Sequence, residues 1–193
     1  FRGTYPGDMV NALEPHGVFK NIDLSEIEKA KVPTDFLGIN YYTRNVMAYD
    51  PDEPLMNMKH VPLEDSEYTG MGWEVYPDGL LHTLLYLYNA YYPAKIYITE
   101  NGCSYDDPDP VDGMVDDPQR KAYFQKHLDA VSTAIDLGVN VAGYFAWSFM
   151  DNFEWAYGYD KRFGLYHVDF ETQERTMKAS AAYYRDRIKE ERG

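Results

Sequence analysis

The alternation of apolar and polar positions divides the chain into three similar units. Each unit predicts a strand of apolar residues, a long polar or aromatic-rich loop, and an amphipathic helix. The expected strands are 32–43 (VPTDFLGINYYT), 95–102 (KIYITENG) and 141–147 (VAGYFAW), and the expected helices are 78–92, 118–137 and 179–191. Alternating strands and helices predict parallel strands joined by crossover helices, so the fold class is α/β.

The ends of the middle helix are marked by two residues with special backbone chemistry. Pro118 occupies the position where the first turn should begin, and Gly138 follows the last apolar position as a stop signal. The first thirty residues are polar and predict helical structure, and the segment 50–72 is rich in Pro, Asp and Gly, which predicts a long loop. The Asp-rich segment 106–117 predicts a solvated loop.

The three strands are apolar on both faces, which is typical of a parallel sheet covered on both sides. Each strand leads at its carboxyl end into a long loop, the arrangement that a (β/α) barrel uses for its active site. Three units do not close an eight-stranded barrel. Either the sheet is open, or the remaining strands belong to another chain.

Composition narrows the classes of function. The chain has 193 residues with a formal net charge of −14 and 45% hydrophobic residues, so it has enough apolar material for a core. The negative charge and the lack of a basic stripe argue against nucleic acid and anionic membranes as partners. A single cysteine, Cys103, allows no internal disulfide, and we expect a cytoplasmic location. The five histidines are scattered without metal-ligand spacing, so we expect no metal and no cofactor.

The carboxyl ends of the three strands bring candidate chemistry together. Glu100 ends the strand YITENG, and Asn40 and Tyr42, at the end of FLGINYYTR, could hydrogen-bond a carboxylate. Aromatic rings beside carboxylates suit carbohydrate, because CH groups pack on π faces and hydroxyls pair with charged acceptors. The third strand end, WSFMDNFEW, supplies such groups in Trp147, Glu154 and Trp155.

These motifs resemble the carboxyl-terminal part of a family-1 glycoside hydrolase, the β-glucosidase family, over residues 1–193. ITENG is similar to that family's nucleophile motif, which implies Glu100 as the catalytic nucleophile. GINYYT resembles the end of its sixth strand, which places Asn40 near the site and makes Tyr42 the residue that orients the nucleophile. The resemblance therefore implies part of one TIM (β/α)8 barrel and retaining hydrolysis of unphosphorylated β-glycosides.

The same resemblance assigns the sugar contacts. GYFAWSFMDNFEWAYGY implies Trp147 as the floor of the glycone site, Glu154 as an acceptor for sugar hydroxyls, and Trp155 as a further contact. KRFGLYHVDF implies Phe163 as a wall, and TGMGWEVYP implies Trp73 on the aglycone side.

The family's second carboxylate, in a T-x-N-E-P motif, is missing from the chain. Residues 11–15 read NALEP, and Glu14 there is interpreted as a surface residue. We therefore expect the acid/base to come from an amino-terminal part of the barrel on a second chain, and the isolated chain to be inactive. Phospho-glycosidases of the family carry a serine where this chain has Glu154. In those enzymes a lysine and a tyrosine follow the serine, and the matching residues here are Lys161 and Phe163. Only the lysine agrees, and we interpret Lys161 as a surface residue.

Two other classes of function stay open. One is a sugar-binding half-barrel without turnover, which would use Trp147, Glu154 and Trp155 equally well. The other is a structural half-barrel whose only role is assembly. A Schiff-base aldolase is rejected, because Lys95 begins its strand and does not end it.

Overall fold

Three parallel strands form the sheet that carries the fold. In the computed structural model, which describes residues 1–192, they are β1 (Leu37–Asn40), β4 (Ile96–Asn101) and β6 (Val141–Ala146), in the order β1-β4-β6. Helix α2 (Pro77–Tyr91) precedes β4, and α3 (Pro118–Asp136) precedes β6. The α/β class and the three strand–helix units expected from the sequence are confirmed.

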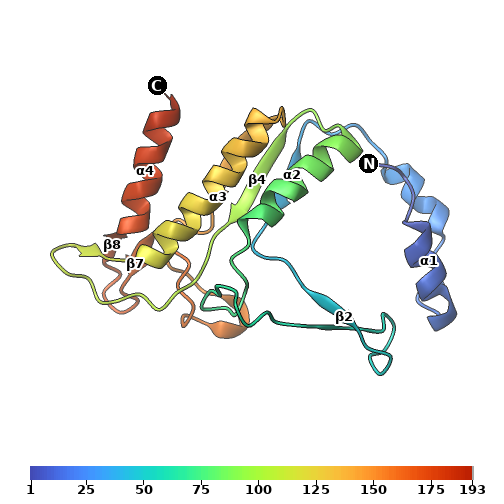
Figure 1. Cartoon of the computed structure of the whole chain (residues 1–193), viewed down its shortest axis with the longest axis horizontal. Coiled ribbons are helices and arrows are strands. Elements are labelled where there is room, and N and C mark those ends of the chain that lie inside the picture. The colour runs from blue at the N-terminus through green and yellow to red at the C-terminus, as the bar shows by residue number, and fades with distance from the viewer. Residues whose placement is uncertain (193) are drawn as a thin grey trace. The chain divides into compact units, whose positions relative to one another are not determined.

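One face of this sheet is covered by helices. Figure 1 shows α2 and α3 side by side over β4. Ile96 and Ile98 of β4 are fully buried. They share a core with buried residues of the two helices, Leu80, Leu84, Val131 and Ala134. Complete burial of an aliphatic side chain stabilises a fold by about 1.5–3 kcal/mol, so this layer contributes much of the stability of the unit.

The opposite face of the sheet is open. Phe36 beside β1 is 52% exposed and Phe145 of β6 is 56% exposed. Gly38, Asn40 and Thr99 are exposed on the same sheet. The expectation of a sheet covered on both faces is therefore wrong for this chain, because helices cover one side alone.

The helix boundaries follow the local signals. Pro118 is the first residue of α3, where its missing N–H leaves no helical bond unmade. Gly138, with φ of 93°, donates its N–H to the Ile135 carbonyl over 2.8 Å and ends the helix. Both predictions are confirmed. Among residues 1–192, no helix combines the length and the apolarity needed to cross a membrane.

A second, smaller sheet lies where the sequence predicted loops. It consists of β5 (Met114–Val115), β7 (Tyr166–Val168) and β8 (Arg175–Lys178), in the order β5-β8-β7. Helix α4 (Ala179–Arg192) follows β8 directly. Strands of 2, 3 and 4 residues are too short to show an alternating pattern, which is why the sequence did not reveal them.

Residues 1–35 and 45–65 form a unit of their own, separate from the unit that contains the main sheet. It contains α1 (Gly7–Leu13), two 3₁₀ helices, η1 (Glu14–His16) and η2 (Leu24–Ala30), and the antiparallel hairpin of β2 (Met47–Tyr49) and β3 (Met58–His60). The prediction of helical structure in the first thirty residues is confirmed. The segment 50–72 was expected to be all loop but includes β3. Glu14 is exposed on η1, as interpreted from the sequence.

Candidate active site

Glu100 lies at a β-bulge near the end of β4. Its partner in β1 is Asn40, one residue later than a regular ladder requires. The ladder to β6 is also irregular between Ile98 and Asn101. In a regular strand, residues that face the same side are two positions apart. Ile98 and Asn101 are both fully buried although they are three positions apart, because the bulge adds one residue between them. Thr99 and Glu100 are therefore both directed away from the helices.

The side-chain amide of Asn101 anchors this bulge from the helix side. Its Nδ2 donates to the carbonyl oxygen of Tyr41 over 2.7 Å and to the hydroxyl of Tyr123 over 3.0 Å. Its Oδ1 accepts a hydrogen bond from the hydroxyl of Tyr144 over 2.5 Å. Tyr41 follows β1, Tyr123 lies on α3 and Tyr144 lies on β6. One buried amide thus links β4 to three neighbouring segments.

The carboxylate of Glu100 is held by a phenol from the neighbouring strand end. Tyr42 donates its hydroxyl to Oε2 of Glu100 over 2.7 Å. The hydroxyl of Tyr123 donates to the carbonyl of Tyr42 over 3.3 Å and so restrains its backbone. Burial, and then the hydrogen bond to Glu100 and its negative charge, raise the pKa of Tyr42. Tyr42 therefore stays a donor at neutral pH.

The rings of Tyr42, Trp73 and Phe163 form an aromatic wall beside the Glu100 carboxylate. The ring of Tyr42 lies 5.3 Å from that of Trp73 and 6.4 Å from that of Phe163, centroid to centroid, both in edge-on geometry. Trp73 and Phe163 lie 6.1 Å apart. Phe163 is 2% exposed, whereas Trp73 is half-buried, so the tryptophan presents the accessible part of the wall.

Trp147 reaches the site at the end of β6. Its N–H donates to the carbonyl of Asn101 over 2.8 Å, and its side chain is half-buried. The peptide bond from Trp147 to Ser148 is cis. A Cβ on Gly102 would lie 1.7 Å from the carbonyl oxygen of Trp147. The glycine after Glu100-Asn101 is thus required for the close approach of the two strand ends.

Glu154 and Trp155 occupy the loop after β6, where Trp155 opens the 3₁₀ helix η3 (Trp155–Tyr157). Burial raises the pKa of Glu154, and the negative charge of Glu100 raises it further, so the two carboxyl groups interact. Trp155 is 80% exposed. Asn40 faces the same end of the sheet, but its Oδ1 accepts from Thr99 Oγ1 over 2.6 Å, whereas the Glu100 carboxylate is bonded by Tyr42.

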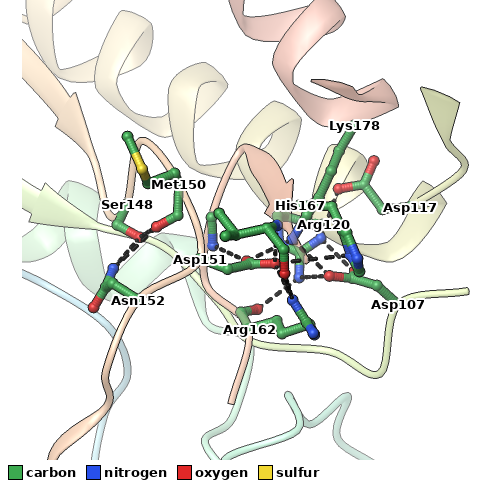
Figure 2. Close-up of polar contacts among 12 residues, drawn as sticks. Asp107, Asp117, Arg120, Ser148, Met150, Asp151, Asn152, Arg162, His167 and Lys178 are labelled. Atoms are coloured by element: carbon green, nitrogen blue, oxygen red, sulfur yellow. Dashed lines mark hydrogen bonds and ion pairs between the residues drawn. The ribbon is translucent and has the colours of Figure 1, made fainter. Parts of the chain in front are cut away.

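Six charged side chains, all buried except that of Arg162, form an ion network, defined as Asp107, Asp117, Arg120, Asp151, Arg162 and Lys178 (Figure 2). Arg120 Nη1 lies 2.6 Å from Asp107 and 2.7 Å from Asp117. Lys178 Nζ lies 2.6 Å from Asp107 and 2.8 Å from Asp151. The prediction that 106–117 is a solvated loop is wrong at Asp107 and Asp117, whose side chains are 1% and 2% exposed.

The ion network ties the loops of the site to the small sheet. Asp151 lies in the loop that carries Glu154, and Lys178 ends β8. Arg162, next to Phe163, donates to Asp151 over 2.7 Å. Burial alone would raise the pKa of Asp151, but the charges of Lys178 and Arg162 hold it below its usual range. The loop is therefore pinned by ionised groups.

One group of residues has the composition of a metal site. Ligand atoms of Asp107, Asp151 and His167 lie within 4.8 Å of one another. The ammonium group of Lys178 already contacts both carboxylates, and burial, followed by the charge of Arg162, lowers the pKa of His167. A lysine thus occupies the position that a cation would need, and the arrangement is an ion network.

Sequence reasoning missed three features of the site: the Asn101 hub, the ion network, and an ion pair between Arg44 and Glu74 beside Trp73. Arg44 Nε lies 2.7 Å from Oε2 of Glu74. The only sequence signal for that pair was a charged residue close to each site aromatic, Arg44 two residues after Tyr42 and Glu74 directly after Trp73.

Comparison with known proteins shows the family. The glycosyl hydrolase family 1 profile matches residues 1–192. "1,4-beta-D-glucan glucohydrolase" of Thermotoga neapolitana is 40% identical over 189 residues, and "Beta-glucosidase A" of Thermotoga maritima is 40% identical over 191 residues. Each alignment covers 98% of this chain and 42% of the relative. A "6-phospho-beta-galactosidase" of Streptococcus equi is 41% identical over 84% of this chain.

Solved structures also match nearly the whole chain. An enzyme from Alicyclobacillus herbarius matches with a TM-score of 0.91 and 40% identity, covering 98% of this chain and 42% of the other. The GH1 β-glucosidase of Exiguobacterium antarcticum matches with a TM-score of 0.89 and 42% identity, at the same coverage. The fold is thus that of part of the TIM barrel of these relatives. The chain belongs to glycosyl hydrolase family 1, and it spans about 42% of the length of these relatives.

The ion network predicts a large effect of Arg120→Met on stability. This change leaves the buried carboxylates of Asp107 and Asp117 without their main cation, and breaking a buried ion pair costs about 3–5 kcal/mol. Urea denaturation followed by circular dichroism measures the free energy of unfolding. Arg185→Met, which removes an exposed pair with Asp186, is the matched control and should change it little. Equal effects of the two variants would contradict the account.

The interaction of the two carboxyl groups predicts a coupled titration. Glu100→Gln should lower the pKa of Glu154, because it removes the neighbouring negative charge while burial keeps the pKa above its usual range. Carbon-13 NMR of the labelled carboxyl groups across pH measures this. Glu174→Gln, on an exposed residue, is the control. An unchanged Glu154 titration in Glu100→Gln would show that the two groups are not in electrostatic contact.

Proposed function

We propose that this chain supplies the nucleophile of a retaining β-glycosidase that acts on unphosphorylated β-glycosides. The observation that carries the proposal is the carboxylate of Glu100, placed at the carboxyl end of a parallel strand and held by the Tyr42 hydroxyl over 2.7 Å. The names of the β-glucosidase relatives and the resemblance of the strand-end motifs support it. The aromatic wall and the nearby carboxylate are the groups a sugar site requires.

The proposed reaction has two displacements. Glu100 attacks the anomeric carbon and forms a glycosyl ester, while the glycosidic C–O bond breaks and the leaving oxygen takes a proton from a carboxylic acid. Water then attacks the same carbon, gives its proton to that group as carboxylate, and releases Glu100. Retention requires the two carboxyl groups to be about 5–5.5 Å apart.

The other residues have supporting roles in this proposal. Tyr42 orients the carboxylate of Glu100 and keeps its own proton. Trp147 would form the floor of the glycone site, and Phe163 would form a wall of the pocket. The resemblance implies Glu154 as an acceptor for the outer sugar hydroxyls and Trp155 as a further sugar contact, and it places Asn40 near the site.

The acid/base is proposed to come from an amino-terminal part of the barrel. Phe36 and Phe145 on the open face of the sheet are each more than half exposed, and β1 and β6 are edge strands. Apolar faces and free strand edges favour pairing with further strands. The relatives' additional length supports the same proposal. The isolated chain is then expected to be inactive.

The charge of Glu154 and the contact of Lys161 favour unphosphorylated substrates. The carboxylate of Glu154 would repel a phosphate. Lys161 Nζ donates to the Gly70 carbonyl over 2.6 Å, so its ammonium is already engaged. A sugar-binding half-barrel without turnover is the second candidate, and the exposure of Trp155 favours it.

The proposal predicts that hydrolysis depends on Glu100. Release of nitrophenol from nitrophenyl β-glucoside should occur when the chain is combined with the amino-terminal part of the barrel, and should fall by several orders of magnitude in Glu100→Gln. Glu174→Gln, an exposed glutamate, is the matched control and should retain activity.

The outcomes separate the candidates. Sugar binding without hydrolysis in the combined protein would favour the binding module. Hydrolysis that survives Glu100→Gln would overturn the assignment of the nucleophile.

A further inference from the structure

The hairpin that carries Trp73 is attached to the Tyr42 segment by an ion pair. Arg44 comes two residues after Tyr42, and Glu74 comes directly after Trp73. Nε of Arg44 donates to Oε2 of Glu74 over 2.7 Å, and Nη2 donates to Oε1 over 3.0 Å. A bidentate pair of this kind fixes both the distance and the relative orientation of its partners.

The pair is buried on the Glu74 side and partly exposed on the Arg44 side, and it has further partners. The side chain of Glu74 is 9% exposed and that of Arg44 is 35% exposed. Ser66 donates its hydroxyl to Oε1 of Glu74 over 2.8 Å. The guanidinium of Arg44 stacks over the ring of Tyr76 at 3.6 Å. Arg44 therefore holds Glu74 through one edge of the guanidinium and packs one face of it on Tyr76.

Within this hairpin, the ion pair of Glu74 also sets the direction of the neighbouring Trp73 side chain. Thr69 donates its N–H to the carbonyl of Trp73 over 2.9 Å, and Tyr68 pairs with Glu74 in an antiparallel bridge. Neighbouring residues in an extended segment point to opposite sides. With Glu74 directed toward Arg44, Trp73 is directed to the other side, where its ring lies 5.3 Å from Tyr42.

The tip of the hairpin is anchored separately. The N–H of Gly70 donates to the carbonyl of Ser104 over 2.7 Å, and Lys161 donates to the Gly70 carbonyl over 2.6 Å. These contacts fix the tip to the loops after β4 and β6. The ion pair fixes the base, where Trp73 and Tyr42 meet.

We propose that Arg44 and Glu74 are positioning residues that hold Trp73 against Tyr42 and thereby set the preference for the leaving group of the substrate. The second part of this statement rests on the proposed function, in which Trp73 lies on the aglycone side. The aglycone is present while the glycosidic bond breaks and is absent when water attacks the glycosyl ester. The ion pair should therefore affect the first displacement and leave the second unchanged.

The positioning role is tested without activity. The chain has three tryptophans, so 5-fluorotryptophan gives a fluorine NMR spectrum that Trp73→Phe and Trp155→Phe assign. Arg44→Met should shift or broaden the Trp73 resonance and leave that of Trp155 in place. Glu74→Gln, which keeps the side-chain shape, should do the same and serves if Arg44→Met fails to fold. Lys126→Met removes an exposed ion pair to Glu67 of the same hairpin and is the matched control. A Trp73 resonance unchanged by both variants would overturn the proposal.

The effect on leaving-group preference is tested in the combined protein. Arg44→Met should lower kcat/KM for nitrophenyl β-glucoside about tenfold relative to methyl β-glucoside, since loss of a charged hydrogen bond has effects of this order. The rate at which a 2-fluoroglucosyl enzyme reactivates in water should not change. Equal losses for both substrates, or slower reactivation, would overturn the preference. Absence of hydrolysis in the unsubstituted protein would refute the proposed function, and the preference with it, while the NMR result still decides the positioning role.

Discussion

The buried side-chain amide of Asn101 is the group on which the arrangement of the site depends. It is fully buried, and a buried amide left without partners costs about 1–3 kcal/mol for each lost bond. Its three partners, the Tyr41 carbonyl and the hydroxyls of Tyr123 and Tyr144, come from different segments. They can meet Asn101 only if β4 carries its bulge, and the bulge directs the preceding residue, Glu100, to the open face.

The carboxylate and its surroundings are stabilised by different means. Hydrogen bonds inside the apolar layer fix the backbone of Tyr42 and Glu100. The connection that carries Glu154 and Phe163 is held by the ion network, through Asp151 and its contacts with Lys178 and Arg162. Because three carboxylates face three cations there, the network is balanced in charge although most of it is buried.

The sequence predicted the main sheet well because its signals are local. The apolar run before Glu100, the proline at 118 and the glycine at 138 each act within a few residues, and the structure confirms the elements they predict. The site motifs also predicted a contact between Glu100 and Tyr42, and the two side chains are hydrogen-bonded in the structure. The aspartates of 106–117 could not be interpreted in the same way. Asp107 is buried because Lys178, 71 positions away, neutralises it, and no local pattern encodes that pairing. The strands of the small sheet were missed because they are so short.

The most direct measurement is covalent trapping of the nucleophile. A dinitrophenyl 2-deoxy-2-fluoro-β-glucoside carries a leaving group that departs without a proton, so its first displacement does not require the acid/base. Its fluorine slows the release of the glycosyl ester, and mass spectrometry of proteolytic peptides then locates the adduct. The account predicts a fluoroglucosyl ester on Glu100, formed with the chain in its combined barrel and lost in Glu100→Gln. An ester on another carboxylate of the chain, or label that persists in Glu100→Gln, would contradict it.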